Sequence, residues 1–198
     1  MTPAPKPTFT KADSVLKPGA DYTAVITTSK GDFTIDFVTD KSPNTTNSFI
    51  FLAERGFYDG LPFTVSRGVT ASDGDPAGDG SGGPGYTTAY ESSGLTNKRG
   101  TLAMIPAPSS SFLRVRQFGS QFYINLKDNV LYDTGGIAAD IRPPFATVTK
   151  GMEIVDALAT GDRIVKIAVI EKAPGTTTPF VRPTVSHPLI INTPTPSR

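Results

Sequence analysis

Alternation of apolar and polar residues predicts several β-strands in this chain. The clearest case covers residues 33–37, which read Phe33, Thr34, Ile35, Asp36 and Phe37. A period of two places the three apolar side chains on one face, which we expect to be buried. Similar β-branched runs cover 22–28 and 163–171. The polar tetrapeptide 29–32 is expected to join strand 22–28 to strand 33–37 as a hairpin.

Two segments have helical spacing instead. The first is expected to begin at Ser42-Pro43, where Ser42 can cap the helix and proline at the first helical position loses no hydrogen bond. Gly56 ends it, and its apolar stripe is Phe49, Leu52 and Ala53. The second helix is predicted over 151–160, with Met152, Val155 and Leu158 at core spacing.

The most informative stretch is 99–126, in which two apolar β-type runs flank a loop rich in proline and serine. Gly119-Ser120 is interpreted as a turn before the second run, Gln121–Leu126. Side chains alternate along a strand, so Gln121 and Tyr123 share one face and Phe122 takes the other. An amide beside an aromatic ring suits the binding of an extended peptide. The amide can form a hydrogen bond with the peptide backbone, and the ring can form the base of an apolar pocket.

The remaining segments set the expected domain boundaries. Residues 1–20 and 173–198 are rich in proline and threonine and are interpreted as a flexible N-terminal tail and a C-terminal extension around a single domain, 21–172. The Gly-, Asp- and Ser-rich segment 72–86 is interpreted as a surface loop. A calcium loop built on Asp73, Asp75 and Asp79 is the weaker alternative, since the EF-hand spacing is missing.

These elements predict a mainly β fold. Antiparallel strands with two helices and no βαβ rhythm favour a closed antiparallel β-barrel capped by the two α-helices. The chain of 198 residues is long enough for one such domain with a sizeable core.

Composition narrows the chemistry. The chain has no cysteine and one histidine, which excludes disulfides, thiolate chemistry and a multi-histidine metal site, so no cofactor or metal is expected. A net charge of +1 favours no nucleic acid and no membrane surface. No apolar run approaches a membrane span and no signal peptide is visible, so we expect a cytoplasmic monomer.

In the order and spacing of several short motifs, this sequence resembles the cyclophilins, which are peptidyl-prolyl cis-trans isomerases. The resemblance covers roughly residues 22–171, and the motifs that carry it follow in chain order: Gly56–Gly60, Gly74-Asp75-Pro76, Gly82–Tyr86, Arg99–Met104, Gly119–Ile124 and Val148–Leu158. It implies a cyclophilin-like barrel, an isomerase acting on Xaa-Pro bonds, and proline-containing peptides or unfolded client proteins as partners.

The resemblance also assigns a groove. Gln121 and Tyr123 match the family's Gln and Phe, Ala107 matches a small groove residue, and Leu131 replaces a groove Trp. Substrate contacts are accordingly expected from Phe63, Thr64, Val69, Ala107, Phe122, Tyr123 and Leu131, and catalytic roles from Arg67, Gln121 and Arg142.

The catalytic arginine of the family is missing from its usual place. Its position falls on Thr64 or Val65, depending on where a one-residue gap lies. Arg67 can reach the site only if Val65 holds that position, because it then shares a strand face with it. Arg142 is the nearest equivalent of the family's groove histidine.

Three hypotheses stay open on these residues. The first is an isomerase, with low activity caused by the displaced cation. The second is a cyclophilin-fold peptide- or protein-binding module without turnover, whose groove the proline-rich tail around Pro194 and Pro196 could itself occupy. The third is a structural domain with a vestigial groove.

Overall fold

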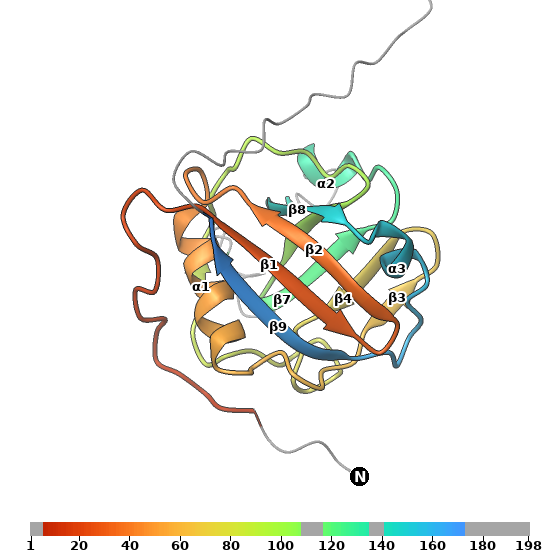
Figure 1. Cartoon of the computed structure of the whole chain (residues 1–198), viewed down its shortest axis with the longest axis horizontal. Helices are drawn as coiled ribbons and strands as arrows, with labels where there is room; N and C mark the ends of the chain where they lie inside the picture. The colour runs from red at the N-terminus through yellow and green to blue at the C-terminus, as the bar shows by residue number, and fades with distance from the viewer. Residues whose placement is uncertain (1–5, 108–116, 135–140, 173–198) are drawn as a thin grey trace, which may run out of the picture.

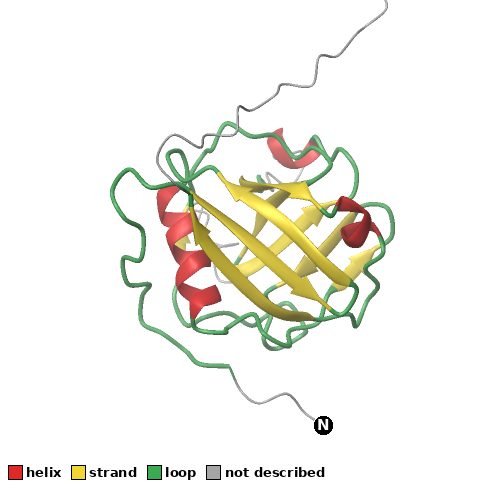
Figure 2. Ribbon diagram, in the orientation of Figure 1, coloured by secondary structure: helices red, strands yellow, loops and turns green. Residues whose placement is uncertain are grey.

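The computed structural model describes residues 6–107, 117–134 and 141–172. One nine-stranded antiparallel sheet dominates it (Figures 1 and 2). The strands are β1 (Tyr22–Thr28), β2 (Gly31–Phe37), β3 (Thr64–Ser66), β4 (Thr70–Asp73), β5 (Thr88–Ala89), β6 (Thr101–Pro106), β7 (Gln117–Asn125), β8 (Pro144–Lys150) and β9 (Ile164–Glu171). The helices are α1 (Pro43–Glu54), α2 (Leu131–Thr134) and α3 (Met152–Asp156).

The sheet curls into a half-barrel. Its strand order is β3-β4-β7-β6-β8-β2-β1-β9, with β5 paired to β7. The two end strands, β3 and β9, share no ladder in the described chain and meet through the bridge between Pro62 and Arg163, beside which the Ile164 N–H donates to the Leu61 carbonyl at 3.2 Å. The mainly β fold is therefore confirmed, and the fully closed barrel is not.

Alternation along the strands explains the core. Phe33, Ile35 and Phe37 of β2 are buried, as their period of two predicts, and the hairpin closes with Thr28 opposite Gly31. Helix α1 covers the open side of the sheet (Figure 2) and contributes Phe49, whose ring stacks on Tyr58 with a centroid distance of 4.9 Å.

Three local expectations are wrong. Ser42 makes no side-chain cap of α1, because its hydroxyl donates to the Val38 carbonyl at 3.0 Å. Gly119-Ser120 is no turn but lies inside β7, where strand pairing outweighs the local turn preference. The second helix, α3, ends at Asp156, although Leu158 is buried as predicted.

The N-terminal segment differs from the expected flexible tail. Residues 6–20 run along α1 (Figure 1), and Phe9, Val15 and Leu16 pack against the core. Asn47 of α1 accepts a hydrogen bond from the Val15 N–H at 2.8 Å. The C-terminal extension 173–198, including its proline-rich end, lies outside the described residues. Among the helices of the described segments, none is long and apolar enough to cross a membrane.

Candidate active site

A row of paired residues crosses three strands on the outer face of the half-barrel. Thr64 of β3 pairs with Ser72 of β4, and Ser72 pairs with Tyr123 of β7. The next row, which contains Val65, Ala71 and Ile124, packs into the core. Residues paired across a sheet point to the same side, so Thr64, and not Val65, lies on the face of Tyr123.

The same register places Arg67 away from this face. Arg67 is exposed and belongs to the turn that joins Ser66 to Thr70, not to a strand. Because Thr70 pairs with Asn125, the turn lies beyond Asn125, which is four residues along β7 from Gln121 and therefore roughly 13 Å from it. Arg67 does not line the pocket beside Gln121.

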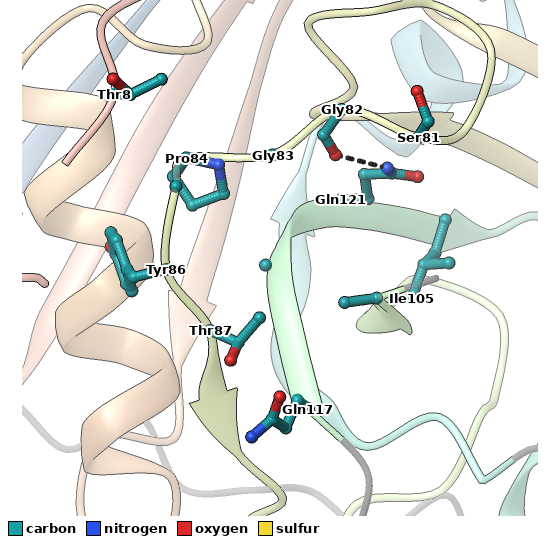
Figure 3. Close-up of a pocket in the computed structure, with 13 residues that line it drawn as sticks. Thr8, Ser81, Gly82, Gly83, Pro84, Tyr86, Thr87, Ile105, Gln117 and Gln121 are labelled. Atoms are coloured by element: carbon teal, nitrogen blue, oxygen red, sulfur yellow. Dashed lines mark hydrogen bonds between the residues drawn. The ribbon is translucent and has the colours of Figure 1, made fainter. Parts of the chain in front are cut away.

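Gln121 lies in a pocket of about 520 Å³ on this outer face (Figure 3). One side is formed by Ile105 and Ala107 around β6, and the opposite side by loop residues 81–87. The Gln121 side chain ties β7 to the loop, since its Nε2 donates to the Gly80 carbonyl at 2.9 Å and to the Gly82 carbonyl at 2.8 Å. These two bonds use the amide donors and orient the Oε1 acceptor.

Asp75 stabilises the loop that faces Gln121 through hydrogen bonds to its backbone. Its carboxylate accepts backbone N–H groups of Ala77 at 3.0 Å, Gly80 at 2.5 Å and Gly82 at 3.0 Å. These bonds fold the loop back, so that Gly80 and Gly82 present their carbonyls to Gln121. The carboxylate of Asp75 therefore has a structural role that needs no calcium ion.

Arg142 lies over the aromatic part of the site. Its guanidinium carbon is 4.3 Å from the ring centroid of Tyr132 and 5.4 Å from that of Tyr123. Its backbone is fixed on both sides, because the Arg142 N–H donates to the Tyr132 carbonyl at 3.1 Å and the Arg142 carbonyl accepts from Asn97 Nδ2 at 2.9 Å. A cation thus lies on the face that carries Gln121 and Tyr123.

Asn97 organises the polar side of this cluster. The Tyr123 hydroxyl donates to Asn97 Oδ1 at 2.6 Å, and Asn125 Nδ2 donates to the same oxygen at 3.1 Å. The Asn97 backbone N–H in turn donates to Asp133 of α2 at 2.8 Å. Tyr123 is fully buried within this network.

Comparison with known proteins decides the family. The family model described as "Cyclophilin type peptidyl-prolyl cis-trans isomerase/CLD" matches residues 23–174. This chain belongs to the cyclophilin family. Cyclophilins of this type are peptidyl-prolyl cis-trans isomerases, so the enzyme class expected from the sequence motifs is confirmed.

Relatives agree along most of the domain. A peptidyl-prolyl cis-trans isomerase of Synechococcus elongatus is 32% identical over 153 residues, which cover 76% of this chain and 97% of that protein. Peptidyl-prolyl cis-trans isomerase B of Bacillus subtilis is 33% identical over 133 residues, which cover 66% of this chain and 85% of the relative.

The fold has solved counterparts. A Cryptosporidium parvum cyclophilin type peptidyl-prolyl cis-trans isomerase, crystallised in the presence of the dipeptide Ala-Pro, aligns with a TM-score of 0.63 at 22% identity. The alignment covers 75% of this chain and 98% of that one.

Two expected substrate contacts of this cyclophilin are core residues. Phe63 is 1% exposed and Phe122 is fully buried. Phe122 packs edge-on against Phe49 at 5.4 Å and Tyr58 at 5.7 Å, inside the half-barrel. Strand alternation already separates Phe122 from Gln121 and Tyr123, so its assignment to the groove was wrong.

The other expected contacts are spread around the site. Ala107 lines the pocket beside Gln121. Val69 is half-buried in the turn before β4, where its carbonyl accepts the Leu126 N–H at 3.0 Å. Leu131 is 72% exposed at the start of α2, next to Tyr132.

Three residues of or beside the site are not indicated by the sequence: Thr8, Asn97 and Tyr132. Asn97 lies in an irregular segment and Tyr132 in the four-residue helix α2, which is too short for an apolar periodicity to signal a role. Thr8 was assigned to a tail, yet it lines the pocket. Asp73, named from the sequence only as a possible calcium ligand, pairs with Phe122 on the core side of β4. It is 4% exposed, and burial raises its pKa to about 7, an effect that tertiary packing alone produces.

Proposed function

We propose that this chain isomerises Xaa-Pro bonds of extended peptides that lie across Gln121 and Tyr123, with Arg142 as the cation at the prolyl amide. The observation that carries the proposal is the position of the Arg142 guanidinium over the rings of Tyr123 and Tyr132. Of the two residues that could match the family's arginine, Thr64 is the one that shares the face of Tyr123, and it has no charge, while Arg67 belongs to a distant turn.

Isomerisation of an Xaa-Pro bond requires only a bound peptide and a positioned charge near the prolyl amide. The barrier to rotation about an Xaa-Pro bond is about 20 kcal/mol, set by amide resonance. A donor near the prolyl amide stabilises the twisted state, in which resonance is lost, and no proton has to be moved. The guanidinium of Arg142 can play this part because it stays charged at all relevant pH values.

Substrate binding is assigned to the groove beside this cation. Gln121 offers Oε1 to a peptide N–H, since its Nε2 is already engaged by Gly80 and Gly82. Ile105 and Ala107 supply apolar contacts along the pocket. A peptide that extends along β7 places its proline at Tyr123 and a residue two positions away at the pocket, because both chains advance about 3.4 Å per residue.

A binding module without turnover is the second candidate, and the burial of Tyr123 favours it. A ring that is fully buried can contact a proline only after its neighbours move. Such a rearrangement would lower the activity, since part of the binding energy is spent on opening the site.

Exchange-detected NMR on an Ala-Pro peptide tests the proposal. Wild type should accelerate cis/trans exchange, and Arg142→Ala should reduce kcat/KM about 100-fold, the scale seen when one stabilising donor is removed. Arg142→Lys should retain part of the rate, because it keeps the charge and loses the planar contact. Arg67→Ala, the matched arginine control, should leave the rate unchanged.

The outcomes separate the candidates. Equal rates for wild type and Arg142→Ala would remove Arg142 from catalysis. Peptide shift changes without any acceleration would establish the binding module. A peptide that neither shifts nor exchanges faster would contradict both candidates.

A further inference from the structure

The N-terminal segment reaches the pocket beside Gln121. Residues 6–9 precede the part of the chain that matches the cyclophilin family, which begins at residue 23. Thr8 nevertheless lines the pocket, opposite Gln121 and Ile105 (Figure 3). This wall is therefore supplied from outside the family's common core.

Phe9 anchors the wall. Its ring packs edge-on against Phe51 of α1 with centroids 5.0 Å apart, and its N–H donates to the Pro84 carbonyl at 2.7 Å. Three residues earlier along the segment, Lys6 Nζ donates to the carbonyls of Gly56 and Asp59. Thr8 is thus held between two fixed points.

The pocket loop is shaped to receive the segment. Gly85 has a φ of +92°, and a Cβ there would lie 2.6 Å from the Phe9 carbonyl oxygen. Only glycine adopts this positive φ at low cost and leaves the space that the Phe9 carbonyl occupies. The segment and the loop 83–85 therefore form one wall, and moving the segment removes the hydrogen bond that holds Pro84.

The lining of the pocket indicates which side chains fit. No charged side chain is among the described residues that line it. Hydroxyl and amide groups come from Thr8, Ser81, Thr87, Gln117 and Gln121. Just outside, the exposed carboxylate of Asp79 accepts the Ser81 hydroxyl at 2.6 Å, which places a negative charge at the rim. A large neutral side chain suits this pocket, and an acidic one does not.

We infer that residues 6–9 are a specificity element of this enzyme: Thr8, held by Phe9, walls the pocket and makes it select large neutral side chains two residues from the proline. The inference rests on the proposed function for the position of the peptide. It also has a direct physical basis, since a pocket that loses one wall exposes its ligand to water and stops discriminating by size.

The test compares peptides that differ only at the residue two positions before, or two positions after, the proline. That residue is Phe, Gln, Glu or Gly. For wild type we expect the highest kcat/KM with Phe or Gln in one of the two series and the lowest with Glu. Phe9→Ala should reduce the preference for Phe over Gly about tenfold, while the discrimination against Glu, set by Asp79, remains.

Two further variants exclude a general loss of stability. Asn47→Ala removes the bonds that hold the segment at Val15 and Asp13, remote from the pocket, and should leave the preference unchanged. Thr8→Trp changes an exposed residue and should block the pocket, which lowers kcat/KM for Phe and spares Gly.

An equal decrease of kcat/KM for all peptides in Phe9→Ala, or an unchanged preference in Thr8→Trp, would overturn the inference. If wild type binds peptides without turning them over, the same preferences are measured as Kd from peptide shifts. Failure of the proposed isomerase function and failure of the specificity wall therefore give different results.

Discussion

Asp73 is a carboxylate enclosed at the end of β4. It is 4% exposed, its Oδ1 accepts the Gly74 N–H, and its Oδ2 has no hydrogen-bond partner among the described residues. Burial raises its pKa to about 7, against the partial opposition of the Gly74 hydrogen bond and of the distant charges of Lys6 and Arg163. Asp75 adds a small contribution in the raising direction.

The sign of the linkage follows from this shift. Between pH 3.8 and about 7 the folded protein holds a proton on Asp73 that the unfolded chain has released. Stability therefore falls as the pH rises through this window, by about 1.4 kcal/mol per pH unit. Over about three units the free energy of unfolding decreases by roughly 4 kcal/mol, and above pH 7 this contribution is constant.

Asp73→Asn removes the titration and keeps an acceptor for the Gly74 N–H. Urea unfolding from pH 4 to 8.5 should show similar stability for wild type and variant at pH 4. At pH 8 the variant should be more stable by roughly 2–4 kcal/mol, less any cost of its new buried amide. Comparing the two proteins cancels the titration of all other groups.

Asp40→Asn is the matched control, because Asp40 is exposed and should leave the pH profile of wild type unchanged. Parallel stability profiles for wild type and Asp73→Asn between pH 4 and 8 would refute the reasoning. A carbon-13 titration of the Asp73 carboxyl gives an independent check, since its midpoint should lie near 7 and not near 4.

Three further predictions concern the backbone, the buried hydroxyl and the cation proposed to act at the prolyl amide. Gly74→Ala should destabilise the fold by about 3 kcal/mol or more, because Gly74 has a φ of +92° and a Cβ there would overlap the Ser120 carbonyl. Gly78 has a φ of +78° and open space around it, so Gly78→Ala should cost only about 1 kcal/mol when both variants are unfolded with urea. Tyr123→Phe should lose about 1 kcal/mol of unfolding free energy with the hydrogen bond to Asn97, and an unchanged urea midpoint would contradict that assignment. Arg142→Ala should lose far more activity than stability, because its backbone bonds to Tyr132 and Asn97 remain and the lost ring contacts are worth about 1 kcal/mol. A destabilisation of several kcal/mol would make Arg142 a structural residue.

Local pattern was enough for much of the fold. The period of two in β1 and β2 placed the hairpin and its buried face correctly, because a strand with one buried face has to alternate. Pro43 and Gly56 marked the limits of α1 closely, since proline and glycine act through their own backbone geometry. The shared order of short motifs indicated the cyclophilin family, which the family comparison confirmed.

Long-range pairing decided what the sequence left open. Thr64 and Val65 are neighbours in the chain, and only the register of β3 with β4 and β7 shows that Thr64 faces the groove. Gly119-Ser120 has a turn composition, yet pairing across β6 and β7 keeps it in a strand.

The sequence by itself thus determined β1, β2, β9, the main helix and the Gln121–Tyr123 face, because these depend on spacings of a few residues. The tertiary structure alone decided that Arg142 lies over Tyr123, that Asp73 is buried, and that Thr8 reaches the pocket. Each of these joins residues far apart in the chain, and their distances are set by packing of the whole half-barrel. Charge, burial and access to the groove are properties of that packing, and no local pattern encodes them.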